Sequence, residues 1–234
     1  MVKEQLTLRF GWQDGFRFSN FYTASNETAV HFLRSIDFSL QYDSNSNHFA
    51  YFWGGEGVGK SHLLQAACQQ VSDSGYSVAY LPLADFEDLN SEMFGGLEQL
   101  SLVCVDDVQI IASNDAWEEA LFHLYNRVHE AKKTLLVAGN VAPNALPIKL
   151  PDLLSRLSWG PVFHLQKLSD DEKIQALRLR AEGRGFELPG EVAQFLLRRS
   201  SRDMTSLFAL LDKLDEASLA QHRKLTIPFV RDLI

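Results

Sequence analysis

The sequence predicts an α/β protein with a parallel β-sheet flanked by helices, followed by a small all-helical domain. Two observations predict this class. Short apolar runs, typical of buried strands, alternate with longer stretches in which apolar residues recur at helical spacing. After about residue 166 the strand-like runs stop and only helical patterns remain. We therefore expect an α/β domain over residues 16–165 and a helical domain over residues 166–234.

The sheet is predicted from five apolar runs that are short enough to be strands. They lie at residues 48–53, 77–83, 101–107, 134–139 and 162–165. Helices are expected between them at residues 60–71 and 115–133, with a short one at 151–157. Strands that alternate with helices form parallel sheets whose two faces are both covered, which explains why these runs are almost wholly apolar.

Three helices are predicted in the C-terminal part of the chain. They lie at residues 170–183, 189–200 and 202–221. Ser169 precedes the first of them and Glu172 follows three residues later, the pattern of a capping box at a helix start.

Composition and charge limit the function. The 234 residues are 46% apolar and 22% charged, an ordinary globular profile, and the net charge is −8. Because gripping DNA phosphates requires a basic surface, direct DNA binding is not favoured. No run approaches membrane-spanning length and no signal peptide is evident, so we expect a cytoplasmic protein with no membrane partner. Cys68 and Cys104 lie in apolar runs and are expected to be buried thiols.

The strongest motif is GGEGVGKS at residues 54–61, which fits G-x-x-x-x-G-K-[ST]. In such a loop successive backbone N–H groups turn toward phosphate oxygens, and the following helix adds its positive end. Lys60 would reach the β- and γ-phosphates, and the Ser61 hydroxyl would bind Mg²⁺. The residues predicted to bind the nucleotide here are Gly55, Glu56, Gly57, Val58, Gly59, Lys60, Ser61 and His62.

Two acids end the third predicted strand. Asp106 would hold the hydration shell of Mg²⁺, and Asp107 could orient or deprotonate an attacking water. The alternative is that both are solvated acids at a strand end. The candidate strand 77–83 lies in the chain between the phosphate loop and these acids, as in P-loop ATPases that carry an additional catalytic acid.

Three further polar residues have both a functional and an ordinary interpretation. Asn140 directly follows a predicted strand, where it could position water against the γ-phosphate or simply occupy a turn. Arg156 is either a surface charge or a finger that reaches the nucleotide of a neighbouring subunit. Arg202 is either an exposed arginine at a helix start or a phosphate contact from the helical domain.

These motifs, in this order and with a helical lid, resemble an AAA+ ATPase. The match narrows to the ATPase domain of the bacterial replication initiator DnaA, which FSNFYTASNETAV (18–30), GGEGVGKSHLLQA (54–66), VDDVQ (105–109), SRL (155–157) and RDM (202–204) resemble. The sequence stops where DnaA would continue into a DNA-binding helix-turn-helix domain. That shorter domain organisation resembles the DnaA-related Hda family. The segments RGFELP (184–189) and RKLTIPFV (223–230) also resemble the lid of that family.

The resemblance implies a regulatory function. In that family the nucleotide-bound protein docks on the DNA polymerase sliding clamp and stimulates hydrolysis of the ATP held by DnaA, which inhibits replication initiation. It implies ADP or ATP as ligand, with ADP favoured, and Mg²⁺. Arg156 would be the finger inserted toward DnaA, Arg202 the lid sensor, and Phe21 and Tyr22 part of the base pocket. A homo-oligomer is also compatible with this plan, and DNA would be reached only through the clamp.

The N-terminal segment, residues 1–15, is predicted to bind the clamp. Gln5-Leu6-Thr7-Leu8-Arg9-Phe10 resembles the short clamp-binding peptide. An extended peptide sends alternate side chains to one side, so Leu6, Leu8 and Phe10 could enter apolar pockets while Gln5 makes hydrogen bonds. The alternative is a plain edge strand with the same three side chains on one face.

Asp107 stands where many AAA+ ATPases have glutamate, and its shorter side chain predicts weak intrinsic ATP hydrolysis. Two other functions compete with the regulatory one. The first is a DnaA-like initiator or accessory loader ATPase that oligomerises on DNA. Against it argues the acidity of residues 1–165, which hold 10 Lys+Arg and 19 Asp+Glu. The second is a metabolic P-loop phosphotransferase, which the extra strand and the helical domain disfavour.

Overall fold

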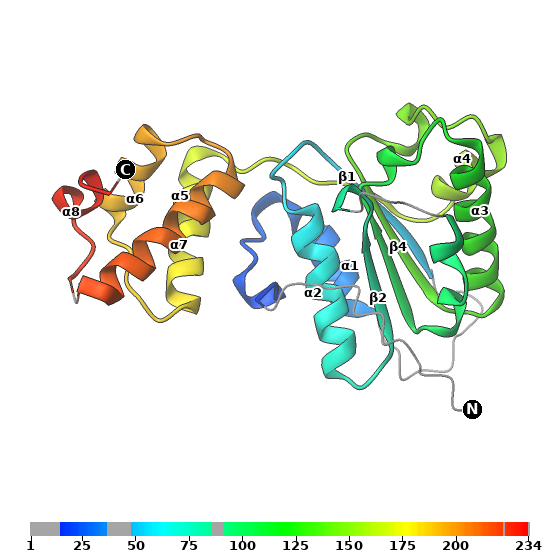
Figure 1. Cartoon of the computed structure of the whole chain (residues 1–234), viewed down its shortest axis with the longest axis horizontal. Helices are drawn as coiled ribbons and strands as arrows, with labels where there is room; N and C mark the ends of the chain where they lie inside the picture. The colour runs from blue at the N-terminus through cyan, green and yellow to red at the C-terminus, as the bar shows by residue number, and fades with distance from the viewer. Residues whose placement is uncertain (1–14, 37–47, 86–90, 222, 234) are drawn as a thin grey trace.

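The computed structural model describes residues 15–36, 48–85, 91–221 and 223–233 (Figure 1). They form a sheet covered by helices and a separate group of helices, as the sequence predicts. The proposed clamp-binding residues Gln5, Leu6, Leu8 and Phe10 lie outside the described residues.

The sheet has five strands, and every pairing in it is parallel. The strands are β1 (Phe49–Trp53), β2 (Val78–Pro82), β3 (Leu102–Asp106), β4 (Thr134–Gly139) and β5 (Val162–His164). All five were predicted. Their order in space is β2-β3-β4-β1-β5, so the strand that separates β1 from β3 is β4, whereas β2 lies at the edge.

The strand register brings the polar ends of β1, β3 and β4 to one edge of the sheet. Trp53 of β1 lies opposite Gly139 of β4, and Val105 of β3 lies opposite Val137 of β4. The phosphate loop and Asn140 directly follow β1 and β4, and the two acids stand at the end of β3, of which Asp106 is the last residue. They therefore share the carboxyl edge, where ligands bind in open parallel sheets.

Helices cover both faces of the sheet. On one face α1 (Glu27–Ser35) and α2 (Lys60–Asp73) pack against inward residues such as Phe52, and on the other α3 (Asp115–Glu130) and α4 (Pro151–Leu157) pack against Tyr51 and its neighbours. Successive strand residues point to opposite faces, so β1 contributes to both cores. Cys68 and Cys104 are fully buried free thiols, as expected, with their sulfur atoms 3.4 Å apart.

Short 3₁₀ turns connect the larger elements. They lie at Phe18–Asn20, Ala24–Asn26, Leu83–Asp85, Ser91–Phe94, Leu97–Gln99, Val108–Ile110 and Pro143–Ala145.

The C-terminal helices form a core of their own around residues such as Leu177, Leu196 and Leu211. They are α5 (Asp170–Gly183), α6 (Gly190–Arg199), α7 (Met204–Gln221) and α8 (Ile227–Arg231), of which the first three were predicted. The predicted capping box is present: the Ser169 hydroxyl accepts from the Glu172 N–H at 3.3 Å, and the Glu172 carboxylate accepts from the Ser169 N–H at 2.7 Å. Within the described chain, no helix is both long and apolar enough to cross a membrane.

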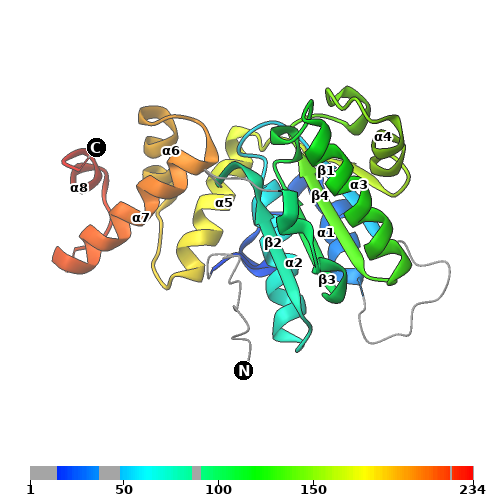
Figure 2. The same ribbon diagram turned by 45° about the vertical axis from the view of Figure 1, so that its right-hand side comes forward.

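The two parts are joined by a linker, residues 165–169, between β5 and α5. The buried Asn26 side chain accepts from the Gln166 N–H at 2.8 Å and donates to the Gln166 carbonyl at 3.2 Å. In both views the C-terminal helices lie beyond α1 and α2, on the side of the molecule away from α3 and α4 (Figure 1, Figure 2). The Asn26 side chain therefore fixes the start of the linker.

Candidate functional site

The predicted phosphate loop connects β1 to α2 and has the conformation that its glycines allow. Gly57 and Gly59 have φ of +72° and +98°, in the left-handed region. A Cβ atom on Gly59 would lie 2.6 Å from the ring of Phe21, so that ring rests directly on the loop. The buried Lys60 ammonium donates to the Gly54 and Gly55 carbonyls at 2.9 and 3.0 Å, and so lies within the loop.

A cavity of about 250 Å³ lies beside this loop. Three segments that are far apart in the sequence line it: residues 16–26 with Phe21 and Tyr22, residues 57–62 of the loop and helix, and the helical part with Met204 and Phe208. The structure therefore brings the two proposed base-pocket residues to the phosphate loop. Gly55 and Glu56 are exposed and do not line the cavity.

His62 lies in the wall of the cavity and is buried. Its Nε2 is 3.0 Å from the Arg17 carbonyl oxygen, and the rings of Phe16 and Phe21 meet it edge-on. Burial lowers the pKa of His62 to about 4, so the imidazole is neutral at neutral pH. A neutral ring can pack against aromatic residues without the cost of burying a charge.

Asp106, at the end of β3, is fully buried and accepts several hydrogen bonds. The Tyr80 hydroxyl of β2 donates to it at 2.8 Å, the Asp107 N–H donates at 2.9 Å, and the Ser61 hydroxyl also contacts it. Burial raises the pKa of Asp106 despite the hydrogen bonds from Ser61 and Tyr80, which act in the opposite direction. The two proposed Mg²⁺ contacts, Ser61 and Asp106, are thus neighbours.

Gln109 connects the other two polar residues at this edge. Its side-chain amide donates to the Asp107 carboxylate at 2.9 Å, and its side-chain oxygen accepts from the Asn140 N–H at 3.1 Å. Asp107 has φ of +57°, which turns the chain away from the strand. The carboxylate proposed to act on water is therefore held by an amide.

Arg156, on α4, rests on aromatic rings. Its guanidinium carbon lies 4.8 Å from the centre of the Trp159 ring and 5.7 Å from that of Tyr125. Trp159 is 67% exposed. Arg156 does not line the cavity, and α4 lies on the side of the sheet away from the C-terminal helices (Figure 2). The structure thus places this side chain at an outer surface.

The position of α4 is set by a buried carboxylate, Glu118 of α3. It accepts backbone N–H groups from Ser113 at 2.7 Å, Lys149 at 2.9 Å and Leu150 at 2.8 Å. Leu150 is the N-cap residue of α4. Glu118 therefore joins the loop after β3 to the start of the helix that carries Arg156.

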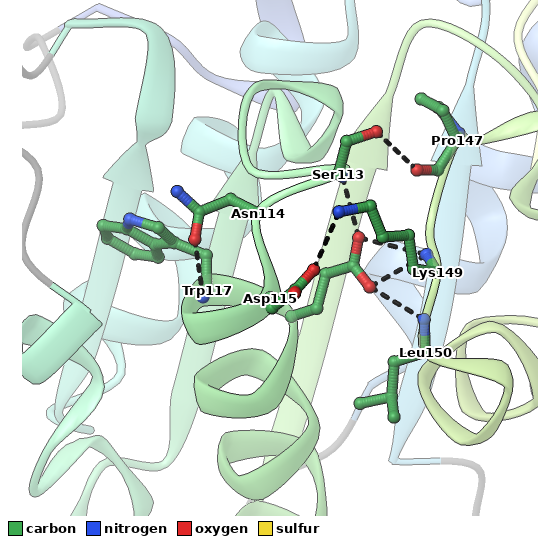
Figure 3. Close-up of polar contacts among 8 residues, drawn as sticks. Ser113, Asn114, Asp115, Trp117, Pro147, Lys149 and Leu150 are labelled. Atoms are coloured by element: carbon green, nitrogen blue, oxygen red, sulfur yellow. Dashed lines mark hydrogen bonds and ion pairs between the residues drawn. The ribbon is translucent and has the colours of Figure 1, made fainter.

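Two outer contacts reinforce this arrangement (Figure 3). The Lys149 ammonium pairs with Asp115 at 2.9 Å, and the Ser113 hydroxyl donates to the Pro147 carbonyl at 2.8 Å. The sequence gives no sign of this network, because a glutamate on an amphipathic helix ordinarily faces solvent.

Arg202 does not line the cavity in this structure. It is 67% exposed and pairs with Asp170, in the first turn of α5, at 3.3 Å. The helix that follows it is nevertheless close to the phosphate loop, because a Cβ on Gly57 would lie 3.7 Å from the Met204 nitrogen. The proposed sensor arginine, Arg202, thus forms an ion pair with the Asp170 carboxylate.

Two family models match the chain. The model of the bacterial DnaA ATPase domain matches residues 12–164, and the model of the Hda lid domain matches residues 170–234. The chain belongs to the DnaA-related AAA+ family. Its helical part is a lid of the Hda type, and we call it the lid below.

Solved structures of related architecture agree with this fold. Domain III of the Thermotoga maritima replication initiation protein DnaA has a TM-score of 0.78 at 22% identity, over 96% of this chain and 97% of that one. AMPPCP-bound DnaA from Aquifex aeolicus has a TM-score of 0.70 at 22% identity, over 87% and 66%. The Thermotoga maritima RuvB branch migration motor has a TM-score of 0.59 at 16% identity, over 80% and 60%.

Replacing the buried acid that anchors α4 should destabilise the protein. In Glu118→Ala the N–H groups of Ser113, Lys149 and Leu150 lose their acceptor, and we expect a loss of about 2–3 kcal/mol in the free energy of unfolding. Urea denaturation measures it. The matched control is Glu119→Ala, an exposed neighbour for which the change should stay within about 0.5 kcal/mol. Equal urea midpoints for the two variants would contradict the assigned role.

The low pKa of His62, about 4, makes stability depend on pH. Between pH 6.5 and 4 the unfolded chain binds a proton that the folded one does not, so stability falls as the pH is lowered. From pH 7 to pH 5 the wild type should lose about 2 kcal/mol more than His62→Gln, since one pKa unit corresponds to about 1.4 kcal/mol. Urea titrations at both pH values test this, with the exposed His31→Gln as control. An identical pH dependence in wild type and His62→Gln would refute it.

Proposed function

We propose that this chain is a nucleotide-dependent regulator of replication initiation. It binds ADP or ATP at Gly54–Ser61 and, with the DNA-loaded sliding clamp, stimulates hydrolysis of ATP bound to DnaA. The observation that carries the proposal is the combination of a complete phosphate loop with a lid that matches the Hda lid model.

The cavity supports nucleotide binding. Phosphates would lie on the loop, where Lys60 would exchange the two carbonyls that it now contacts for phosphate oxygens. Phe21 and Tyr22 would provide an apolar wall for the base. A DnaA of similar fold is bound to AMPPCP, which agrees with this site.

Ser61, in the first turn of α2, and Asp106, at the end of β3, fit Mg²⁺. A hydroxyl and a carboxylate are the hard oxygen donors that this ion prefers, and Ser61 and Asp106 are in contact. Mg²⁺ is held mainly by phosphates and water, so the protein needs to supply few ligands. When bound, it would neutralise phosphate charge.

Intrinsic hydrolysis is expected to be weak. Asp107 has a shorter side chain than glutamate, and Gln109 already holds its carboxylate. Asn140 is exposed at the end of β4, where it could face a γ-phosphate. The nucleotide would then serve mainly to hold the loop, residues 16–26 and the lid together.

Arg156 would act on the nucleotide of DnaA. It lies at an outer surface on the far side of the sheet from the lid, so it cannot serve the cavity of its own chain without rearrangement. Stacking on Trp159 and Tyr125 would limit its conformations. An arginine finger supplied in trans accelerates hydrolysis by ~10³–10⁵ in other P-loop systems.

The clamp would be bound by the N-terminal segment. The support is the pattern at Gln5, Leu6, Leu8 and Phe10, and the net charge of −8, which disfavours holding DNA directly. DNA would then be reached only through the clamp.

The N-terminal proposal predicts a separable defect. Replacing Gln5 and Leu6 by alanine should abolish clamp binding, because it removes the hydrogen-bonding amide and one apolar anchor, and should leave ADP affinity intact. Surface plasmon resonance on immobilised clamp and calorimetry with ADP measure the two properties. Undiminished clamp binding by this variant would show that the N-terminal assignment is wrong.

The proposal that Arg156 is an arginine finger predicts a variant that keeps binding and loses stimulation of hydrolysis. Arg156→Ala should bind clamp and ADP normally but reduce stimulated hydrolysis of DnaA-bound ATP by at least about 10²-fold. Hydrolysis is measured with DnaA–ATP, DNA-loaded clamp and ADP, and the exposed Arg178→Ala is the control.

Normal stimulation by Arg156→Ala would remove this residue from the mechanism. Absence of stimulation by the folded wild-type protein would favour the alternative, a DnaA-like ATPase that itself oligomerises on DNA.

A further inference from the structure

Lys167, in the linker between β5 and α5, lies against the phosphate loop. A Cβ atom placed on Gly55 would be 3.1 Å from its Cε and 3.5 Å from its Nζ. The ammonium group therefore lies beside the first half of the loop. It belongs neither to the G-x-x-x-x-G-K-[ST] motif nor to the residues predicted from the sequence.

The backbone on either side of Lys167 is held in place. Asn26 binds both backbone groups of Gln166, at 2.8 and 3.2 Å. The Leu165 carbonyl lies against Gly54, where a Cβ would approach it to 2.7 Å, and Leu168 lines the cavity. The backbone position of Lys167 thus follows from contacts of its neighbours, and its side chain starts from a fixed point beside the loop.

Among the described residues, Lys167 forms no ion pair with a carboxylate. It is exposed. Arg202, the other cation proposed to approach from the lid side, is paired with Asp170 at 3.3 Å. Of these two side chains, Lys167 is the one that adjoins the loop with its charge unneutralised.

We propose that Lys167 is a second lysine contact for the phosphates of the bound nucleotide, supplied from the linker. This inference rests on the proposed nucleotide binding at Gly54–Ser61. A lysine ammonium is a compact charge on a flexible stem, and it can turn from the Gly55 face toward a phosphate oxygen. Because the linker leads directly into α5, the contact would also make the position of the lid depend on the phosphates.

The test compares affinities for ATP and ADP, measured by fluorescence titration with Mg²⁺. Lys167→Ala should weaken both by about tenfold, since hydrogen bonds to charged groups are the stronger ones. Lys167→Glu should weaken them further, and Lys167→Arg should stay within about twofold of the wild type. The control is Lys213→Ala, which removes an exposed lysine from α7 and should leave affinity unchanged.

Salt dependence separates a phosphate contact from a purely structural effect. The affinity of the wild type for ATP should fall more steeply with NaCl concentration than that of Lys167→Ala, because the wild type has one additional charge pair that salt can screen. Wild-type affinity in both Lys167→Ala and Lys167→Glu, together with lost binding in Lys60→Ala, would overturn this inference alone. Absence of nucleotide binding by the wild-type protein would overturn the proposed function as well.

Discussion

A buried carboxylate at the end of β3 connects the phosphate loop to the sheet. Asp106 accepts hydrogen bonds from Tyr80 of β2 and from Ser61 of the loop, so one side chain fixes the loop relative to two strands. This requires parallel strands whose carboxyl ends coincide, which the register of β1, β3 and β4 provides. The raised pKa of Asp106 reflects the cost of burying its charge. A cation bound nearby would offset that cost by favouring the ionised form.

Glu118 is a second buried acid, but its partners differ in kind. Its described hydrogen bonds come from backbone N–H groups, which cannot be redirected without moving the chain. The side-chain partners of Asp106 are hydroxyl groups, which can rotate to meet a metal ion or its water. One acid is therefore suited to an adjustable site and the other to a fixed support. Asp106, with the adjustable partners, lies at the phosphate loop, and Glu118, with the fixed ones, lies at the start of the helix that carries Arg156.

The sequence predicted the features that depend on neighbouring residues in the chain. The five strands, the phosphate loop and the Ser169–Glu172 capping box are all such local patterns. The roles of Tyr80, Gln109 and Glu118 were not predicted from the sequence. Their hydrogen-bond partners depend on strand order and loop packing rather than on neighbours in the chain. The order in space also placed β4, rather than the strand at 78–82, between β1 and β3. Helix α8 has five residues, too few turns for a clear periodic signal, whereas α1 was not predicted although it has nine residues.

Three segments from distant parts of the sequence meet at one cavity, and this bears on what the nucleotide would do there. Residues 16–26 contribute Phe21, the loop contributes Gly59, and α7 contributes Met204. A ligand that contacts all three stabilises their joint arrangement by its own binding free energy, whether or not it is hydrolysed. Slow hydrolysis, as expected from the Asp107–Gln109 contact, would prolong that arrangement. Arg156 lies on α4, away from the cavity, so a long-lived nucleotide state leaves it free to act on another protein. The geometry therefore suits a nucleotide that is held as a structural ligand more than one that is turned over.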